Sequence, residues 1–470
     1  MNKIRSIHFI GIKGVGMTPL AIIAKEAGIK VSGCDVDEEF ITDEVLKNAG
    51  IKAQVEFSEK HLENIDLIVT TGAHGGFENT EVVEAKKKEI PVWTQGQAAG
   101  EFMKGEIFGK SFIGISVSGT HGKTTTTAMI STILKENKLE PSFLIGTGNV
   151  PYLNSSGSFG KGRYFVAEAD EYATEPKYDK TPKLLWQKPY IAVITNIELD
   201  HPDLYATEED IRNAFLHFTN NILQDGKLVV CIDDINSRKL ANETLANKIT
   251  YGFSKNANFY VEKVHIDGEK MFFWVYSGNA ILGEFMLNVT GEHNALNALA
   301  SVIVCLELGL SLQQIKSGLL KFKGSRRRFE FIKDLQSGAA VYDDYAHHPT
   351  EIKKTLSAFK KTFPNKKIIC IFQPHTYSRT KKLFEQFVYS FSDADELILT
   401  DIYPSQREEK DESISSNHLK NKIYEFFSKV SYLPSLTDVV KYVDQKKFGS
   451  DYIILTMGAG DIYKIASDLN

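Results

Sequence analysis

The stretch Gly119-Thr120-His121-Gly122-Lys123-Thr124-Thr125 decides the fold class, because it joins an apolar strand pattern at 112–117 to a helical pattern at 125–136. At such a turn, glycines let backbone N–H groups approach phosphate oxygens, and the helix N-terminus adds a positive dipole. Lys123 supplies a point charge, and the Thr124 hydroxyl can reach a magnesium ion. The stretch predicts an ATP-binding loop in an α/β domain, with a chance Gly-Lys-Thr in an ordinary turn as the alternative.

The segments on both sides of this loop alternate between strand and helix patterns, which predicts parallel sheets covered by helices. Upstream, strand patterns at 6–10 and 30–34 alternate with helical patterns at 17–27 and 43–49. Downstream, further strand patterns occur at 163–168, 190–195 and 227–231.

Short alternating segments between residues 259 and 289 predict a small antiparallel sheet, which a helical pattern at 294–308 closes. Strand patterns then resume at 340–343, 367–372, 396–399 and 451–457. A chain of 470 residues exceeds the length that one hydrophobic core supports. We therefore expect an α/β protein of three domains at 1–106, 107–322 and 323–470.

The composition is that of an ordinary globular protein, with 42% hydrophobic and 24% charged residues. Its apolar runs are as long as strands and fall short of the ~20 residues that a membrane-spanning helix needs. The first residues lack the features of a secretory signal, so we expect a cytoplasmic protein. The net charge of −5, without a long basic run, argues against nucleic acid as a partner.

The four cysteines, Cys34, Cys231, Cys305 and Cys370, are scattered and show no Cys-x-x-Cys or Cys/His spacing. This pattern predicts neither a disulfide framework nor a zinc site. We expect reduced thiols that are mostly buried.

A second glycine-rich turn, with Gly11, Gly14 and Gly16, follows the first strand pattern, and Asp35 ends the next one. The spacing is related to the dinucleotide-binding fingerprint, but such loops bind many nucleotides and also occur as purely structural turns. Because an ATP loop is already assigned elsewhere, a second nucleotide-like ligand such as a diphosphate sugar carrier fits this turn better than NAD.

Acidic and histidine side chains follow two strand patterns of the middle segment. Glu168 begins the run Glu-Ala-Asp-Glu, and His201 ends the run Asn-Ile-Glu-Leu-Asp-His. Ligands bind at the carboxyl ends of strands in open α/β sheets, so Glu168 and His201 can meet beside the phosphate loop as ligands of a hard cation. Taken singly, each is more often a solvated loop carboxylate or a hydrogen-bonded histidine.

Three polar residues, His293, Asn294 and Asn297, lie at the start of the helical pattern at 294–308, with the two asparagines on one face. N-capping by one asparagine is the structural alternative, but it explains one of the three residues. The group therefore favours a contact with the nucleotide.

Arginines gather in the last segment, at Arg327 and Arg328 and again at Arg379. A guanidinium forms paired hydrogen bonds with carboxylates and phosphates, so these residues suit either ligand. An exposed basic turn is the alternative for the first cluster.

The motifs occur in order along nearly the whole chain: GIKGVGM, GTHGKTTT, EADE, TNIELDH, GEHNALNAL, RRRFE, DDYAHHPTE, FQPHTYSRT and TMGAGDI. In this combination the sequence resembles the Mur ligases of peptidoglycan synthesis. The resemblance implies a Rossmann-like N-terminal domain for a UDP moiety and a central P-loop ATPase domain. It also implies a Rossmann-like C-terminal domain that carries the amino-acid substrate and closes over ATP.

The resemblance assigns roles to the residues that match these motifs. It implies that Gly11, Gly14, Gly16 and Asp35 serve the UDP substrate, and that residues 119–125 serve ATP, with Lys123 on the phosphates. Thr124, Glu168 and His201 would serve magnesium, and His293, Asn294 and Asn297 would lie near the adenine. Arg327 and Asp344 would approach ATP from the C-terminal domain, while His348 and Arg379 would face the reacting groups.

The reaction implied by the resemblance begins when the lactyl carboxylate of UDP-N-acetylmuramate attacks ATP to give an acyl phosphate, which the amine of L-alanine then attacks. Tyr172 and an insert at 173–188 depart from the members that use L-alanine. They resemble members that attach the tripeptide L-Ala-γ-D-Glu-meso-diaminopimelate, so the tripeptide is the alternative amine. The GVGM loop and the C-terminal motifs favour L-alanine. A monomer or homodimer is expected, and a P-loop switch or kinase is the alternative from another class.

Overall fold

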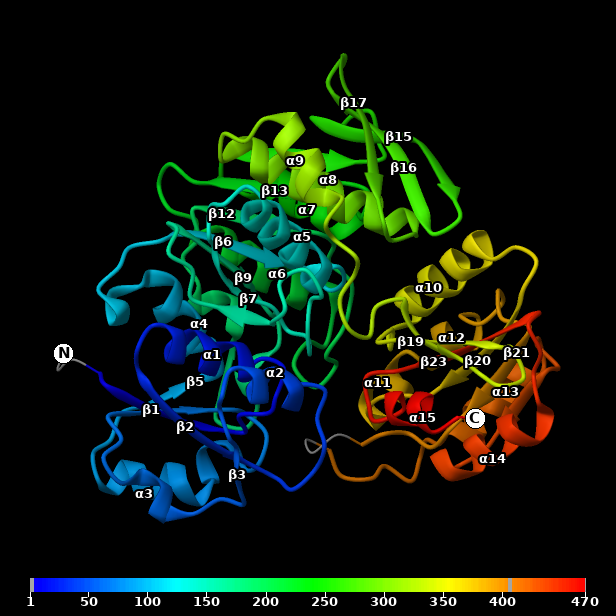
Figure 1. Cartoon of the computed structure of the whole chain (residues 1–470), viewed down its shortest axis with the longest axis horizontal. Coiled ribbons are helices and arrows are strands. Elements are labelled where there is room, and N and C mark those ends of the chain that lie inside the picture. The colour runs from blue at the N-terminus through cyan, green and yellow to red at the C-terminus, as the bar shows by residue number, and fades with distance from the viewer. Residues whose placement is uncertain (1–3, 405–407, 470) are drawn as a thin grey trace.

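The computed structural model describes residues 4–404 and 408–469. Residues 1–3, at the start of the segment that lacks secretory features, lie outside the described part. Figure 1 shows three bodies along the chain: an N-terminal one in blue, a central one in cyan and green, and a C-terminal one in yellow to red. Within the described residues, no helix is long and apolar enough to cross a membrane. The domain boundaries at 106/107 and 322/323 stay predictions.

The N-terminal domain is built on a five-stranded parallel sheet with the order β3-β2-β1-β4-β5. Its strands are β1 (Ser6–Ile10), β2 (Lys30–Asp35), β3 (Gln54–Val55), β4 (Leu67–Thr70) and β5 (Val92–Thr94). Its helices are α1 (Thr18–Glu26), α2 (Asp43–Asn48), α3 (Thr80–Lys87) and α4 (Gln95–Lys104), with short turns η1 (Glu59–Leu62), η2 (Gly76–Glu78) and η3 (Glu106–Phe108). Side chains alternate along β1, so Phe9 packs in the core with α1 and α4, whereas Ile10 packs in the core with α3.

The central domain carries a ten-stranded sheet with the order β17-β16-β15-β14-β13-β12-β6-β9-β7-β8. Its strands are β6 (Ile113–Ser118), β7 (Ser142–Leu144), β8 (Gly157–Ser158), β9 (Tyr164–Glu168), β12 (Ile191–Ile194), β13 (Lys227–Cys231), β14 (Lys248–Gly252), β15 (Phe259–Asp267), β16 (Lys270–Ser277) and β17 (Ala280–Leu287). Its helices are α5 (Lys123–Glu136), α6 (Glu208–Thr219), α7 (Ile235–Glu243), α8 (Glu292–Glu307) and α9 (Leu312–Leu319). The antiparallel strands β15 to β17 continue the parallel part through a short β14–β15 pairing.

The C-terminal domain has a six-stranded sheet with the order β18-β19-β23-β20-β21-β22, parallel except for β18. Its strands are β18 (Glu330–Asp334), β19 (Ala340–Asp344), β20 (Lys367–Phe372), β21 (Glu396–Leu399), β22 (Val430–Tyr432) and β23 (Tyr452–Met457). Its helices are α10 (Pro349–Thr362), α11 (Tyr377–Lys382), α12 (Phe384–Val388), α13 (Ser416–Tyr424), α14 (Leu436–Lys446) and α15 (Tyr463–Asp468).

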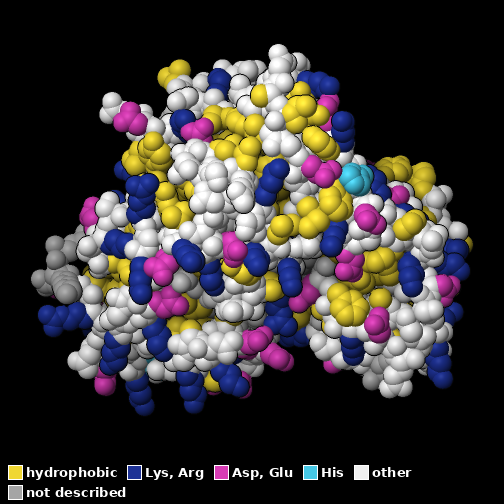
Figure 2. All heavy atoms as spheres, turned by 45° about the horizontal axis from the view of Figure 1, so that its top comes forward, with side chains coloured by type: hydrophobic (Ala, Val, Ile, Leu, Met, Phe, Trp, Pro, Cys, Tyr) yellow, Lys and Arg dark blue, Asp and Glu magenta, His cyan; other side chains and the backbone are white. Residues whose placement is uncertain are grey.

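The predicted fold class is confirmed, with two differences of detail. The antiparallel strands are hydrogen-bonded to the edge of the parallel sheet through β14, so they extend it rather than stand apart. The insert at 173–188 is structured: it forms the hairpin of β10 (Ala173–Glu175) and β11 (Asp179–Pro182), followed by the turn η4 (Lys183–Trp186). Figure 2 shows basic and acidic side chains interspersed over the face that it draws, as suits a chain of small net charge.

Candidate active site

The loop at 119–125 lies between β6 and α5, as the sequence predicts, and its backbone is held by the segment that follows β12. Gly122 has φ +85°, and a Cβ there would lie 2.5 Å from Asn297 Oδ1, so a side chain does not fit. The His121 N–H donates to Asn196 Oδ1 at 2.9 Å, and the Asn196 side-chain amide donates to the His121 carbonyl at 3.0 Å. The loop is therefore rigidly placed at the N-terminus of α5.

Lys123 faces a carboxylate. Its Nζ lies 2.8 Å from Glu171 Oε2 and donates to the Gly119 carbonyl at 2.6 Å. Burial alone would lower the pKa of Lys123, but the negative charges of Glu171 and Asp170 outweigh burial and raise it. Burial raises the pKa of Glu171 to about 7 in spite of the nearby ammonium. Glu171 thus holds Lys123 at the loop, a partner that the sequence motif did not single out.

Two separate sets of polar side chains lie beside this lysine: Glu168 with Thr124, and His201 with Asp170 and Glu171. The Thr124 hydroxyl donates to Glu168 Oε2 at 3.2 Å, and the Gly146 N–H donates to Glu168 Oε1 at 2.6 Å. His201 gathers instead with Asp170 and Glu171, and one ligand atom from each of these three lies within 4.8 Å of the others.

The sequence predicts that Glu168 and His201 meet. Among the described residues, however, no close group of possible metal ligands contains both of them. His201 sits in the left-handed region, with φ +54°, and burial lowers its pKa to about 4. The imidazole Nε2 of His201 lies 3.9 Å from Glu171 Oε1 and 3.8 Å from Asp200 Oδ2.

A cavity of about 440 Å³ opens next to the loop, between α5 and α8 of the central domain and α10 of the C-terminal domain. Its walls include three predicted adenine-site residues, His293, Asn294 and Asn297. Asn297 donates to Asn294 Oδ1 at 3.1 Å, and Asn294 donates to the Thr290 carbonyl at 2.7 Å. The N-cap of α8 is Gly291 without a side-chain cap, so N-capping by an asparagine does not explain these residues.

The C-terminal domain closes this cavity with Asp344 and Arg328. Burial raises the pKa of Asp344 to about 6. Arg327, which the sequence predicts to approach ATP, is instead buried within its own domain, with Nε 2.8 Å from Asp343 Oδ2 and Nη2 donating to the Gly458 carbonyl at 2.6 Å. Of the two neighbours, Arg328 is the one that lines the cavity, because Arg327 turns at φ +60° toward the sheet.

His348 and Arg379 lie at the contact between the C-terminal and central domains. Arg379 Nε is 2.8 Å from Asp200 Oδ1, and the His348 Nε2–H donates to the Leu199 carbonyl at 3.3 Å. Both side chains are buried. They therefore hold the residues that immediately precede His201, which places them beside the predicted reaction site as interdomain contacts.

His121, a buried residue of the loop at 119–125, links this loop to Glu351 of α10. His121 Nδ1 lies 3.2 Å from Glu351 Oε1, and His121 Nε2 lies 3.5 Å from Glu198 Oε2. Burial opposes the charge on His121, but Glu351 and Glu198 raise its pKa to about 9. Glu351 was missed by sequence reasoning, although it follows His348 at the spacing of a capping box, which the structure forms.

The other glycine-rich turn lies between β1 and α1. Gly11 has φ +74°, and its N–H donates to the Cys34 carbonyl at 2.9 Å. Asp35 Oδ2 accepts from the Lys13 N–H at 2.8 Å, and Asp35 Oδ1 lies 3.3 Å from His74 Nε2. Gly14 and Gly16 lie on the same turn, and Gln95 donates to the Gly16 carbonyl at 3.3 Å. The structure thus brings together the four predicted UDP-site residues, with Asp35 shaping the loop.

The insert hairpin packs on the N-terminal domain. Thr174 shares a hydroxyl hydrogen bond with Thr94, and Tyr178 donates to Glu78. A Cβ at Gly100 would lie 2.1 Å from the Trp186 carbonyl oxygen, so α4 admits the insert only where it carries glycine. At the other end, Lys183 lies 2.8 Å from Asp170 Oδ2. The insert therefore connects the N-terminal domain to the acidic group near Lys123.

Comparison with known proteins identifies relatives along the whole chain. Three family models match: the Mur ligase family catalytic domain at 6–106, the Mur ligase middle domain at 117–305, and the Mur ligase glutamate ligase domain at 327–460. The UDP-N-acetylmuramate–L-alanine ligase of Clostridium acetobutylicum is 42% identical, covering 98% of this chain and 96% of the relative. The enzyme of the same name from Desulfitobacterium hafniense is 38% identical, covering 98% and 99%.

Solved structures agree with these relatives. The UDP-N-acetylmuramate–alanine ligase of Thermotoga maritima superposes with a TM-score of 0.80 at 26% identity, covering 98% of this chain and 97% of that one. A murein peptide ligase from Psychrobacter arcticus superposes with a TM-score of 0.72 at 25% identity, covering 99% and 98%.

Proposed function

The chain belongs to the Mur ligase family, and we propose on this premise that it acts as a UDP-N-acetylmuramate–L-alanine ligase in peptidoglycan synthesis. The observation that carries the proposal is the cavity beside the Lys123 loop, whose walls come from both the central and the C-terminal domain. Such a site suits a ligase, because one domain can hold ATP while the other brings the amine to the activated carboxylate.

The donor set beside Lys123 fits a hard divalent cation. Thr124 and Glu168 offer oxygen atoms that contact each other at 3.2 Å, and His201 lies with two further carboxylates. Oxygen donors of this kind suit magnesium. We assign Thr124 and Glu168 to this ion as direct ligands, whereas His201 lies with Asp170 and Glu171 and acts beside the ion through those carboxylates. Bound magnesium would neutralise charge on the ATP phosphates.

In the first step, a lactyl carboxylate oxygen bonds to the γ-phosphorus of ATP while the bond from that phosphorus to the β–γ bridging oxygen breaks. The products are an acyl phosphate and ADP. The Lys123 ammonium, held by Glu171 and the Gly119 carbonyl, is placed to neutralise charge on the transferring group. Removing Lys123 therefore removes charge stabilisation at the reacting phosphorus.

In the second step, the neutral amine of L-alanine attacks the acyl carbon, the bond from that carbon to the phosphate oxygen breaks, inorganic phosphate leaves, and the proton lost by the amine nitrogen passes to phosphate or solvent. Water would compete with the amine for the acyl phosphate. Arg379 and His348 join the two domains at Asp200 and Leu199, which supports their assignment as groups that keep the site closed and the His201 turn in place.

L-Alanine is favoured over the tripeptide as the amine. Relatives at 42% and 38% identity over nearly the full chain carry the name of L-alanine ligases. The insert that raised the tripeptide alternative packs with its tip on the N-terminal domain, through Thr174 and Tyr178. These contacts support a role of the tip of the insert on the UDP-sugar side, while Lys183 at its other end lies beside Asp170.

The test is ADP release by the full chain with UDP-N-acetylmuramate and, in turn, L-alanine, L-serine, glycine and the tripeptide. We expect release to require both the sugar nucleotide and an amine, with the highest kcat/KM for L-alanine. The Lys123→Ala protein serves as the blank for contaminating ATPase. Efficient use of the tripeptide with negligible use of L-alanine would establish the alternative amine, and ADP release without either substrate would support a nucleotide switch.

A further inference from the structure

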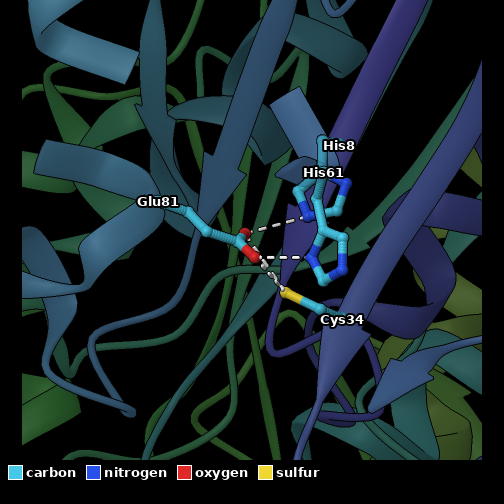
Figure 3. Close-up of side chains that lie close together, drawn as sticks. All are labelled: His8, Cys34, His61 and Glu81. Carbon is cyan, nitrogen blue, oxygen red and sulfur yellow. Dashed lines mark hydrogen bonds and ion pairs between the residues drawn. The ribbon is translucent and has the colours of Figure 1, made fainter. Parts of the chain in front are cut away.

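Four metal-ligating side chains meet inside the N-terminal domain, away from the ATP loop. They are His8 on β1, Cys34 on β2, His61 on η1 and Glu81 in the first turn of α3. One ligand atom from each lies within 4.8 Å of the others. Figure 3 shows the two imidazoles and the thiol converging on the Glu81 carboxylate. None of these side chains belongs to the site proposed above.

The pairing of β1 with β2 places His8 and Cys34 on the same face of the sheet. β1 and β2 run parallel, with His8 opposite Ser32 and Ile10 opposite Cys34. Since side chains alternate along a strand, His8, Ile10 and Cys34 point to the same side. That side is the apolar layer in which Ile10 and Cys34 pack with Val82 of α3 and Leu62 of η1. In this apolar layer the four polar side chains obtain their hydrogen bonds from one another and from a few neighbouring groups, since buried polar groups are costly unless they have partners.

The contacts converge on Glu81. Its Oε2 lies 3.0 Å from His8 Nε2 and 3.2 Å from Cys34 Sγ, and its Oε1 lies 2.7 Å from His61 Nδ1. In a tetrahedral zinc site the ligand atoms lie about 2.0–2.3 Å from the metal, and hence about 3.3–3.8 Å from one another. The ligand atoms would therefore move apart to admit the ion, by about 0.3 Å or more between His8 and Glu81 and by about 0.6 Å or more between His61 and Glu81.

We propose that His8, Cys34, His61 and Glu81 form a closed zinc site. The thiolate and the carboxylate would supply two negative charges, and the imidazoles would bind in their neutral forms, so that the buried complex has no net charge. Binding replaces the thiol proton of Cys34 by zinc and releases that proton to solvent. His8 coordinates through Nε2 and His61 through Nδ1, with Cys34 Sγ and one Glu81 oxygen completing the set.

Neighbouring groups orient these ligands. The Nδ1 of His8, the nitrogen that does not face Glu81, lies 2.8 Å from Ser32 Oγ. The Ser58 N–H donates to Glu81 Oε1 at 2.7 Å, and Asn79 caps α3 by accepting from the Glu81 N–H at 3.0 Å. Second contacts of this kind fix ring orientation and carboxylate geometry in metal sites. His61 is the ligand that reaches the surface, with 16% of its side chain exposed, and it marks the entry path.

The site also adjoins the glycine-rich turn. The Cys34 carbonyl accepts from the N–H groups of Gly11 at 2.9 Å and Ile12 at 3.1 Å. A metal on the Cys34 side chain therefore holds β2 against the loop to which we assign the UDP substrate. The role of the ion is structural: it joins β1, β2, η1 and α3 in one domain.

The first test is the metal content of the full chain after zinc loading and gel filtration. We expect one zinc per wild-type chain, and loss of that zinc in Cys34→Ala and His61→Ala. The matched controls are Cys305→Ala, a buried cysteine elsewhere, and His418→Ala, an exposed histidine, and both should keep the ion. Because His61 is partly exposed on a short turn, His61→Ala tests the site even where Cys34→Ala disturbs folding.

The second test replaces zinc by cobalt. A thiolate-to-cobalt charge-transfer band should appear with the wild type and be absent with Cys34→Ala. Ser32→Ala, which keeps all four ligands, should weaken zinc binding by about 10-fold. Substoichiometric zinc in the wild type, or zinc retained by both ligand variants, would overturn the proposal and leave a hydrogen-bonded group. These readouts do not involve ligation, so their outcome is independent of the proposed activity.

Discussion

The two glycine-rich turns share a position between a strand and a helix, yet their surroundings differ. The turn at 119–125 presents Lys123 to Glu171 and lies beside Glu168 and a cavity closed by another domain. The turn at 11–16 carries Lys13, whose ammonium donates to the Glu38 carbonyl at 2.7 Å, and it is shaped by Asp35. On the proposed function, the first turn serves phosphoryl transfer and the second holds the sugar nucleotide, and the two similar backbone turns differ in the side chains that distant segments bring to them.

The largest expected effect separates the two lysines. Lys123→Ala should lower kcat for ADP formation by at least about 10³-fold, because charge on the transferring phosphoryl group loses its cation. Lys13→Ala should leave kcat within about 3-fold and act mainly on the KM of the sugar nucleotide. Steady-state kinetics with varied UDP-N-acetylmuramate checks both. Equal losses of kcat in the two variants would remove the distinction between the turns.

A second prediction concerns pH, because His121 pairs with carboxylates of two domains. Its folded pKa of about 9 exceeds the ordinary 6.5, so its stabilising charge is fully present below pH 6.5 and is lost as pH rises through 9. The loss amounts to on the order of 3 kcal/mol in the free energy of unfolding. Denaturant unfolding at pH 6 and pH 10 should show a large wild-type advantage over His121→Asn at the lower pH and a small one at the higher.

His418→Asn, at an exposed position, is the control for this series and should follow the wild type at both pH values. A wild-type advantage that is the same at pH 6 and pH 10 would contradict the ion pairs of His121 with Glu351 and Glu198.

The smallest expected effect is on magnesium. Glu168→Gln should raise the magnesium concentration for half-maximal activity by about 10–100-fold, since Glu168 is assigned to its coordination, and His201→Ala should raise it by about 10-fold, since His201 lies with the neighbouring carboxylates. Asp35→Asn, in the other turn, should leave the magnesium requirement unchanged. Titration of ADP release with magnesium measures all three. Curves for Glu168→Gln and His201→Ala that coincide with the wild type would return these residues to a structural role.

Much of the fold and part of the site could be predicted from the sequence. The position of the loop at 119–125 before α5, and of His293, Asn294 and Asn297 at the start of α8, could be predicted because glycine spacing and helix-start patterns are local. Arg327 and Arg328 could not be told apart, since the choice depends on a positive φ at Arg327 and a buried partner at Asp343. Glu171 and Glu351 were missed because a carboxylate acquires its role from what it faces.

The sequence by itself determined the α/β class, the ATP loop and the likeness to Mur ligases, because backbone turn chemistry and strand–helix alternation depend on neighbouring residues. Only the tertiary structure decided that Arg328 lines the cavity, that His201 lies with Glu171, and that the insert packs on the N-terminal domain. The same holds for His8, Cys34, His61 and Glu81, whose spacing predicts no metal site. They meet because parallel pairing and the packing of α3 bring together side chains that are far apart along the chain.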